Sequence, residues 1–240
     1  MQKSDADIAM IDKDEVIVPG KLRPKDAATL ILVRRDAHEP RILMGRRHGD
    51  MAFMAGKFVF PGGRIDPGDQ RIAAGGDLQP EVLKKVAAGI TPERARGLAL
   101  AAIRETFEET GVLVGTKAGR TPRTRSPGWR RFFAHGVVPE LARLDFIGRA
   151  ITPPNRTRRF DARFFMADAE AIAHRLEAID NEELLTPCWV TFDEARALDL
   201  PSITRRMMDE AEARLDDAPG TARPAPFFRS WRGKARLDYL

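Results

Sequence analysis

Three glutamates lie close together in the segment Arg104 to Val112, at positions 105, 108 and 109. On a helix, the spacing i, i+3 and i+4 places their carboxylates on one face, where like charges repel. Carboxylate oxygens suit hard cations such as magnesium or manganese, so a divalent ion between them would relieve the repulsion. The alternative is a solvated acidic face in which Arg104 pairs with Glu108, one turn along the helix. The triplet alone leaves both interpretations open.

The surrounding residues predict the helix that carries this triplet. Thr91 can cap a helix, Pro92 suits the first helical position, and Glu93 favours the positive end of the helix dipole. Gly111 is expected to end the helix. The residues opposite the glutamates are mostly apolar: Ala99, Leu100, Ile103, Phe107 and Thr110. The sequence therefore predicts a helix that packs by one face and presents carboxylates from the other.

A glycine-rich segment lies upstream, between Lys57 and Asp69. Residues 58–60 predict a short strand, and the run Pro61-Gly62-Gly63 ends it. Because glycine lets the backbone approach a ligand closely, a carbonyl or amide group here could meet an ion or a phosphate. The segment is therefore a candidate partner for the three glutamates.

Together the two segments resemble the Nudix box, G-x5-E-x7-R-E-U-x-E-E-x-G-U, in which U is aliphatic. Gly63 is followed by five residues and then Asp69, and the second half runs from Arg104 to Val112. The chain departs from the pattern in three ways: aspartate replaces the first glutamate at position 69, the aliphatic position is Thr106, and residues 70–103 supply 34 residues instead of seven. We therefore interpret the motif as a Nudix box divided by an insertion.

The resemblance extends over about residues 25 to 200 and implies an α/β fold. A box interrupted at this place is similar to that of the coenzyme A diphosphatase-like Nudix subgroup and its bacterial relatives. The implied architecture is a Nudix-type α/β/α sandwich with a mixed sheet, in a domain of residues 26–215 with a helical insertion at about 70–96. We expect residues 1–25 to form an N-terminal tail or an added strand, and residues 216–240 a C-terminal tail.

The resemblance also implies an activity. Nudix enzymes hydrolyse a nucleoside diphosphate linked to another moiety, and coenzyme A or a derivative is one candidate substrate. The implied cofactor is Mg²⁺ or Mn²⁺, held by Glu105, Glu108 and Glu109 with a backbone carbonyl at Gly62. One carboxylate, with Glu105 as the candidate, would orient or deprotonate water, and Arg104 would brace the glutamates.

Other residues are candidates for contacts with the substrate or for an additional acid. Gly63, Arg46 and Arg64 are expected to contact the anionic diphosphate, since arginine's fork suits phosphate oxygens. The family often takes a further acid from elsewhere in the chain, and our candidates are Glu182 and Glu183. The alternative for this pair is a surface position at the start of a strand.

Two other functions stay open. The first is a non-catalytic Nudix module that binds a nucleotide or a protein, although retention of all three glutamates favours an enzyme. The second is an RNA-processing pyrophosphohydrolase, for which only the grouped arginines give support. These arginines either form a solvated face or an electropositive rim that attracts an anionic substrate. We find no nucleic-acid-binding motif and do not expect a nucleic-acid partner; a homodimer is left open.

Composition bounds the remaining possibilities. The chain has 240 residues, a net charge of +5 and a single cysteine, Cys188, so no internal disulfide framework is expected. The longest mainly apolar run, residues 27–33, is far too short to cross a membrane, and residues 1–20 lack the apolar stretch of a signal peptide. We expect a cytoplasmic protein of one domain.

The pattern of apolar and turn-forming residues predicts the remaining elements. A hairpin is expected at 26–35 and 41–47, a short helix at 79–88, a mobile loop at 116–131, and strands at 144–151, 160–167 and 182–190. Helices are expected at 168–176, 192–198 and 202–215.

Overall fold

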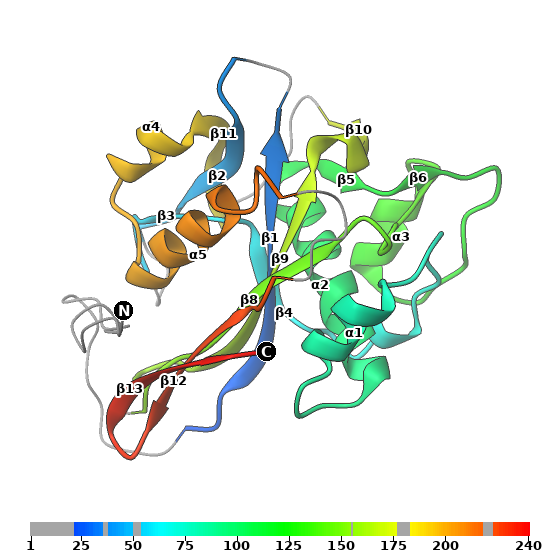
Figure 1. The fold of residues 1–240 in the computed structure, drawn as a ribbon. Coiled ribbons are helices and arrows are strands. Elements are labelled where there is room, and N and C mark those ends of the chain that lie inside the picture. The colour runs from blue at the N-terminus through cyan, green and yellow to red at the C-terminus, as the bar shows by residue number, and fades with distance from the viewer. Residues whose placement is uncertain (1–21, 36–37, 50–53, 155, 177–182, 218–222) are drawn as a thin grey trace.

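A mixed sheet forms the centre of the molecule (Figure 1). The computed structural model describes residues 22–35, 38–49, 54–154, 156–176, 183–217 and 223–240. The strand order is β11-β2-β1-β9-β8-β12-β13, with β3 paired to β2 and β4 paired to β1. The strands of this sheet are β1 (Lys25–Arg34), β2 (Arg41–Arg47), β3 (Phe58–Val59), β4 (Gly62–Arg64), β8 (Asp145–Ile151), β9 (Phe160–Asp168), β11 (Leu184–Thr191), β12 (Pro226–Trp231) and β13 (Lys234–Tyr239).

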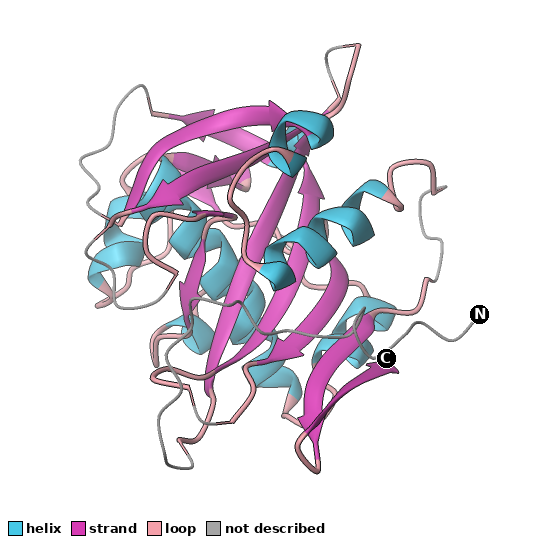
Figure 2. Ribbon diagram, turned by 90° about the vertical axis from the view of Figure 1, so that its left-hand side faces the viewer, coloured by secondary structure: helices cyan, strands magenta, loops and turns pink. Residues whose placement is uncertain are grey.

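Helices cover both faces of the sheet (Figure 2). One face packs against α1 (Pro80–Val86), α2 (Pro92–Thr110) and α3 (Pro127–Phe133), and the other against α4 (Phe192–Arg196) and α5 (Ser202–Glu212). Successive side chains of a strand point to opposite faces, and β1 shows this directly. Leu30 and Leu32 join the core beside α2, whereas Ile31 and Val33 join the core beside α5. The predicted α/β/α sandwich is confirmed.

The sheet divides at β1, and this division positions the glycine-rich segment. The C-terminal end of β1 pairs with β2, through Val33 and Ile42. Its N-terminal part pairs instead with β4, through Ala28 and Gly63 and through Thr29 and Gly62. Because β4 continues the sheet beside β1, the two glycines lie directly over the helix α2, which packs on β1 and β4.

Helix α2 is the predicted helix, with the predicted ends. The Thr91 side chain accepts a hydrogen bond from the Arg94 amide, and Gly111 ends the helix in the left-handed conformation, with φ of 70°. The burial differs from our expectation, because α2 is buried on nearly all sides. Arg104 and Glu109 are each only 3% exposed. The acidic face is therefore an interior surface rather than an open platform.

The insertion in the box forms a compact cover on the α2 side of the sheet. It begins with the short 3-10 helix η2 (Asp69–Arg71) and contains α1. Two arginines of the sheet bind carbonyl groups at the C-terminal end of α1: the buried Arg163 donates from Nε to Val86 at 3.0 Å, and the partly buried Arg149 donates from Nη1 to Ala88 at 2.9 Å. Cations are favourable at this end of a helix, so these contacts hold the insertion against the sheet.

Three sequence predictions are wrong. Residues 168–176, expected to be helical, form the 3-10 helix η3 (Ala169–Ala171) and the strand β10 (Ile172–Arg175), which pairs with β5 (Val112–Val114). The predicted loop at 116–131 contains β6 (Thr116–Lys117), which pairs with β7 (Val137–Val138), and the start of α3. The predicted C-terminal tail contains the β12–β13 hairpin, which adds two strands to the sheet (Figure 1).

Two further points concern the ends of the chain and its helices. Most of the segment 1–25 lies outside the described residues, apart from 22–25, of which Lys25 begins β1. No helix in the described part of the chain has the length and apolar character needed to cross a lipid bilayer.

Candidate active site

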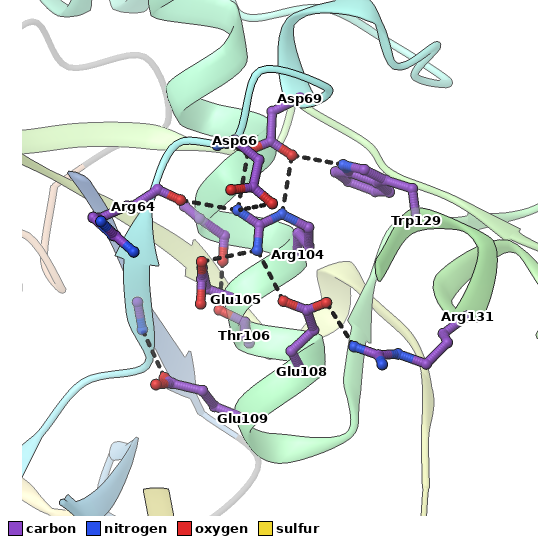
Figure 3. A network of polar contacts seen from close by, with 12 residues as sticks. Arg64, Asp66, Asp69, Arg104, Glu105, Thr106, Glu108, Glu109, Trp129 and Arg131 are labelled. Atoms are coloured by element: carbon purple, nitrogen blue, oxygen red, sulfur yellow. Dashed lines mark hydrogen bonds and ion pairs between the residues drawn. The ribbon is translucent and has the colours of Figure 1, made fainter. Parts of the chain in front are cut away.

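Arg104 is the centre of the polar network on α2 (Figure 3). Its Nη1 atom donates to Glu105 Oε1 and to Glu108 Oε2, both at 2.8 Å. Its Nη2 atom donates to the carbonyl oxygen of Arg64 at 2.9 Å, which ties β4 to the helix. These contacts agree with the predicted bracing role, because one guanidinium fixes two of the glutamates and the backbone beside Gly63.

Asp69 anchors the other side of the Arg104 guanidinium. Its two carboxylate oxygens accept hydrogen bonds from Arg104 Nε and Nη2, each at 3.0 Å. The Asp69 carboxylate also accepts from the Trp129 indole N–H at 2.7 Å and from the Asp66 amide at 2.7 Å. Asp69 is fully buried. A buried carboxylate with four donors is a structural support, so the aspartate at this position orients Arg104 and lies behind the glutamates.

Glu105 and Glu109 contact the two glycines of β4. A Cβ atom added to Gly63 would lie 2.4 Å from the carboxyl carbon of Glu105. Only glycine therefore allows the Glu105 carboxylate to occupy this position. Glu109 Oε2 accepts a hydrogen bond from the Gly62 amide at 2.8 Å. This contact uses the Gly62 N–H, and the predicted role of the Gly62 carbonyl as a metal ligand stays a prediction.

Glu108 lies on the side of the network nearest α3. Its Oε1 atom accepts a hydrogen bond from Arg131 Nη2 at 2.8 Å, while Oε2 is held by Arg104 (Figure 3). The Arg131 side chain is 66% exposed, so this ion pair can open with little loss of stability. Glu108 thus has one interior partner, Arg104, and one partner at the surface, Arg131.

Burial changes the ionisation of the site. It raises the pKa of Glu105 to about 7, against the opposing charge of Arg104. It raises the pKa of Glu109 to about 8, with a further increase from the charge of Glu105 and a decrease from the Gly62 hydrogen bond. Burial opposes the charge of Arg104, but the hydrogen bond to Asp69 and the neighbouring carboxylates outweigh it and raise its pKa. The local arginines therefore do not fully offset the cost of burying the charged carboxylates of Glu105 and Glu109.

A cavity of about 870 Å³ opens beside this network. Glu105 and Glu108 line it, together with Gly62, Gly63 and Arg64. Of its lining residues, none comes from the insertion at 70–96. Arg46, a predicted substrate contact, does not line the cavity, and its Nε atom donates to the Gly56 carbonyl. Its neighbour Arg47 does line it, because adjacent residues of β2 face opposite sides.

Glu183 also lines the cavity, at the point where β11 approaches β2. Its charge contributes to raising the pKa of both Glu105 and Glu109. The structure thus brings this candidate acid, from a distant part of the chain, to the glutamates of α2. Glu182, the other candidate, lies outside the described residues.

The carboxylate donor set fits a hard divalent ion, although these carboxylates do not converge on one point. No group of three or more His, Cys, Asp or Glu side chains in the described ranges is arranged as a metal site. The reason is that Glu105 and Glu108 turn towards Arg104, and Glu109 towards the Gly62 amide. Their carboxylate oxygens are the ligands that Mg²⁺ or Mn²⁺ prefers. A bound ion would also compensate the negative charge that burial disfavours.

Sequence reasoning missed the supporting residues of α3. Trp129 and Arg131 contact Asp69 and Glu108, yet both fall at the end of the segment that we predicted to be a loop. A signal was present, because Pro127 suits a first helical position and the aromatic residues 129, 132 and 133 have helical spacing. The sequence contained no signal for the partners of these side chains.

Comparisons with known proteins agree with this geometry. A Caenorhabditis elegans protein whose name places it among the Nudix hydrolases is 28% identical over 154 residues, which cover 59% of this chain and 43% of that protein. The chain thus spans less than half the length of this relative. The crystal structure of a Nudix hydrolase from Alicyclobacillus acidocaldarius matches with a TM-score of 0.61 and 26% identity, over 78% of this chain and 90% of that one.

No family model matches the chain. The two halves of the box are separated in the sequence by the insertion at 70–96. In three dimensions the halves meet, through the contacts of Arg104 with Asp69 and with the Arg64 carbonyl. The fold, the rejoined box and the two similar proteins all point to the Nudix superfamily.

Proposed function

We propose that the protein is a pyrophosphohydrolase that requires Mg²⁺ or Mn²⁺ and cleaves the diphosphate linkage of a nucleoside diphosphate joined to another moiety. One observation carries this proposal: Glu105, Glu108 and Glu183 line the same cavity as Arg47 and Arg64. Acidic groups that suit a divalent cation thus stand beside arginines that suit phosphate oxygens. The cavity volume of about 870 Å³ lies within the range for small-molecule and cofactor sites.

Each residue has a defined task in this proposal. Glu105, Glu108 and Glu109 would hold the ion, which when bound neutralises the diphosphate and makes water more acidic. Arg47 and Arg64 would bind phosphate oxygens. Glu105 or Glu183 would accept the proton of the attacking water, since each carboxylate lines the cavity. The water oxygen forms a bond to one phosphorus, the bridging P–O bond breaks, and two phosphomonoesters leave.

The finer features of the function rest on weaker support. Coenzyme A as the substrate is supported only by the position of the insertion, which resembles that of one subgroup. A cytoplasmic location is supported by the single cysteine. Dimer formation and the absence of a nucleic-acid partner stay predictions.

The test is hydrolysis of a panel of nucleoside diphosphate derivatives, with both products identified by mass spectrometry. We expect turnover with Mg²⁺ or Mn²⁺, none with a chelator, and a loss of at least about a hundredfold in Glu109→Gln. Glutamine can keep the Gly62 hydrogen bond without the buried charge, so this variant should fold. Glu81→Gln, at an exposed position on α1, is the matched control and should keep full activity.

Other results would support the alternatives. If wild type and Glu109→Gln are equally inactive on the whole panel but bind nucleotides, the protein is a binding module. Salt-sensitive binding of RNA without turnover of small molecules would favour RNA processing.

A further inference from the structure

The cavity has a long floor formed by two neighbouring parallel strands. Alternate residues of β1 (Lys25, Ala27 and Thr29) and of β9 (Phe160, Ala162 and Phe164) all line it. Alternate residues of a strand share one face, and the register pairs Lys25 with Phe160 and Thr29 with Phe164. The floor therefore runs along the strands, from the level of Thr29 to the level of Lys25.

The glutamates lie near one end of this floor. Gly62 pairs with Thr29 and Gly63 with Ala28, and these glycines contact Glu109 and Glu105. From Thr29 to Lys25 the chain advances four residues, which at about 3.3 Å per residue of strand is about 13 Å. The far end is thus far enough from the glutamates for a metal-bound diphosphate and a ribose to lie between them.

The far end of the cavity is cationic. Arg23, Lys25, Arg158 and Arg159 line it, and the acidic lining residues are Asp66, Glu105, Glu108 and Glu183. Arg159 donates to the carbonyl oxygens of Leu22 and Thr152, which hold its guanidinium in place. The side chains of Arg23, Lys25 and Arg158 form no ion pair with a carboxylate in the described part of the chain.

The nearest carboxylates along these strands are occupied elsewhere. Asp26 pairs with Arg94 and Asp161 with Arg149, and both acids alternate with residues that line the cavity, so they lie on the opposite face. Between the two ends the floor is apolar, formed by Ala27 and Ala162, with Phe160 at the level of Lys25 and Phe164 at the level of Thr29. The cavity therefore has three parts: carboxylates that would hold a divalent cation beside a diphosphate, an apolar middle, and a separate group of basic side chains.

We propose that the substrate carries a phosphomonoester in addition to the diphosphate, and that Lys25, Arg158 and Arg159 at the far end of the cavity bind it, with Arg23 adding positive charge. This inference rests on the proposed function for the position of the diphosphate. It narrows the substrate class to nucleotides with a phosphate on the ribose as well as the linkage that is cleaved. Arginine and lysine suit a phosphate dianion, and the apolar middle suits the nucleoside that joins the two groups.

The test compares matched substrates that differ by one phosphomonoester, namely NADPH with NADH and coenzyme A with dephospho-coenzyme A. Wild type should show a higher kcat/KM for the phosphorylated member by about tenfold or more, the equivalent of one charge-assisted hydrogen bond. Lys25→Ala/Arg158→Ala should lose this preference while keeping its kcat/KM for the unphosphorylated member. Arg120→Ala, at an exposed arginine away from the cavity, should keep the wild-type preference.

A binding measurement separates this proposal from the proposed function. Adenosine 2′,5′-bisphosphate, adenosine 3′,5′-bisphosphate and AMP are titrated calorimetrically into wild type and the double variant without metal. Tighter binding of a bisphosphate by wild type, lost in the double variant, would support the cationic subsite even if no substrate is hydrolysed. Equal binding of all three nucleotides by wild type, or a double variant that keeps the preference, would overturn it.

Discussion

Substitution of the two adjacent glycines of β4 should separate the chemistry of the site from the stability of the fold. In Gly63→Ala, the new Cβ would lie 2.4 Å from the Glu105 carboxyl carbon. This carboxyl group is the end of a flexible side chain, and it must move about 1 Å to reach an ordinary contact. A displacement of this size in a catalytic group can cost about a hundredfold in rate, whereas the backbone at Gly63 needs no rearrangement.

Gly62→Ala is the matched control, because the two atoms nearest to its Cβ would belong to the backbone. The contacts are 2.5 Å to the Ala28 carbonyl oxygen and 2.7 Å to the Thr29 Cα atom, both in the central strand β1. Neither can move without bending the sheet, so we expect a loss of about 1–3 kcal/mol in the free energy of unfolding.

The assays are thermal unfolding, Mn²⁺ affinity and kcat/KM. Gly63→Ala should unfold near the wild-type temperature while its Mn²⁺ affinity and kcat/KM fall, and Gly62→Ala should show a Tm lowered by about 2–4 °C per kcal/mol. A Gly63→Ala variant with wild-type affinity and activity would refute the close contact of Glu105 with β4. A Gly63→Ala variant as unstable as Gly62→Ala would refute this contact as well.

Two further predictions concern the buried polar network. Trp129→Phe removes the indole donor of Asp69 and should lower the free energy of unfolding by about 1.5–3 kcal/mol, measured by urea unfolding. The control Trp231→Phe, at a half-exposed position, should change it by less than about 1 kcal/mol. Equal losses in the two variants would contradict the assigned hydrogen bond. Because burial raises the pKa of Glu105 to about 7 and of Glu109 to about 8, the folded metal-free protein retains protons that the unfolded chain has released. Its Tm should therefore fall as pH rises from about 5 to about 8, with a smaller fall in Glu109→Gln, and an equal or steeper fall in that variant would contradict the raised pKa.

The sequence was sufficient for elements whose signals are local. The ends of α2 follow from Thr91, Pro92 and Gly111, and the structure places the helix between them. The rejoined box could be predicted as well, because each of its halves is a short contiguous motif. In such segments, capping and turn chemistry act within a few residues, so no tertiary information is needed.

Elements that depend on distant partners were not predictable in the same way. The alanine-rich residues 169–173 favour a helix by composition, but pairing with β5 makes 172–175 a strand. The C-terminal hairpin turns at Arg232 and Gly233, both with positive φ, and Gly233 is the residue of the pair that signals a turn in the sequence. Its attachment to β8 depends on the position of a strand about 80 residues earlier in the chain, which no local pattern records.

The residues of the candidate site also divide into those that the sequence could name and those that only the structure could. The three glutamates and the glycines could be named as candidates from their resemblance to the Nudix box, and so could Glu183 as a candidate acid. The donors around Asp69 come from Asp66, just before η2, from α2 and from α3, and the cationic end of the cavity joins the starts of β1 and β9. These groups meet only in the folded sheet, so their chemistry could be derived only from the structure.

The most direct test of a divalent-cation site on α2 is a Mn²⁺ titration at pH 8, followed by electron paramagnetic resonance. Wild type and Glu81→Gln should bind Mn²⁺ with the same affinity, and Glu105→Gln and Glu109→Gln should each bind it at least about tenfold more weakly. If all four proteins bind Mn²⁺ equally, or none of them binds it, the glutamates of α2 do not form the metal site.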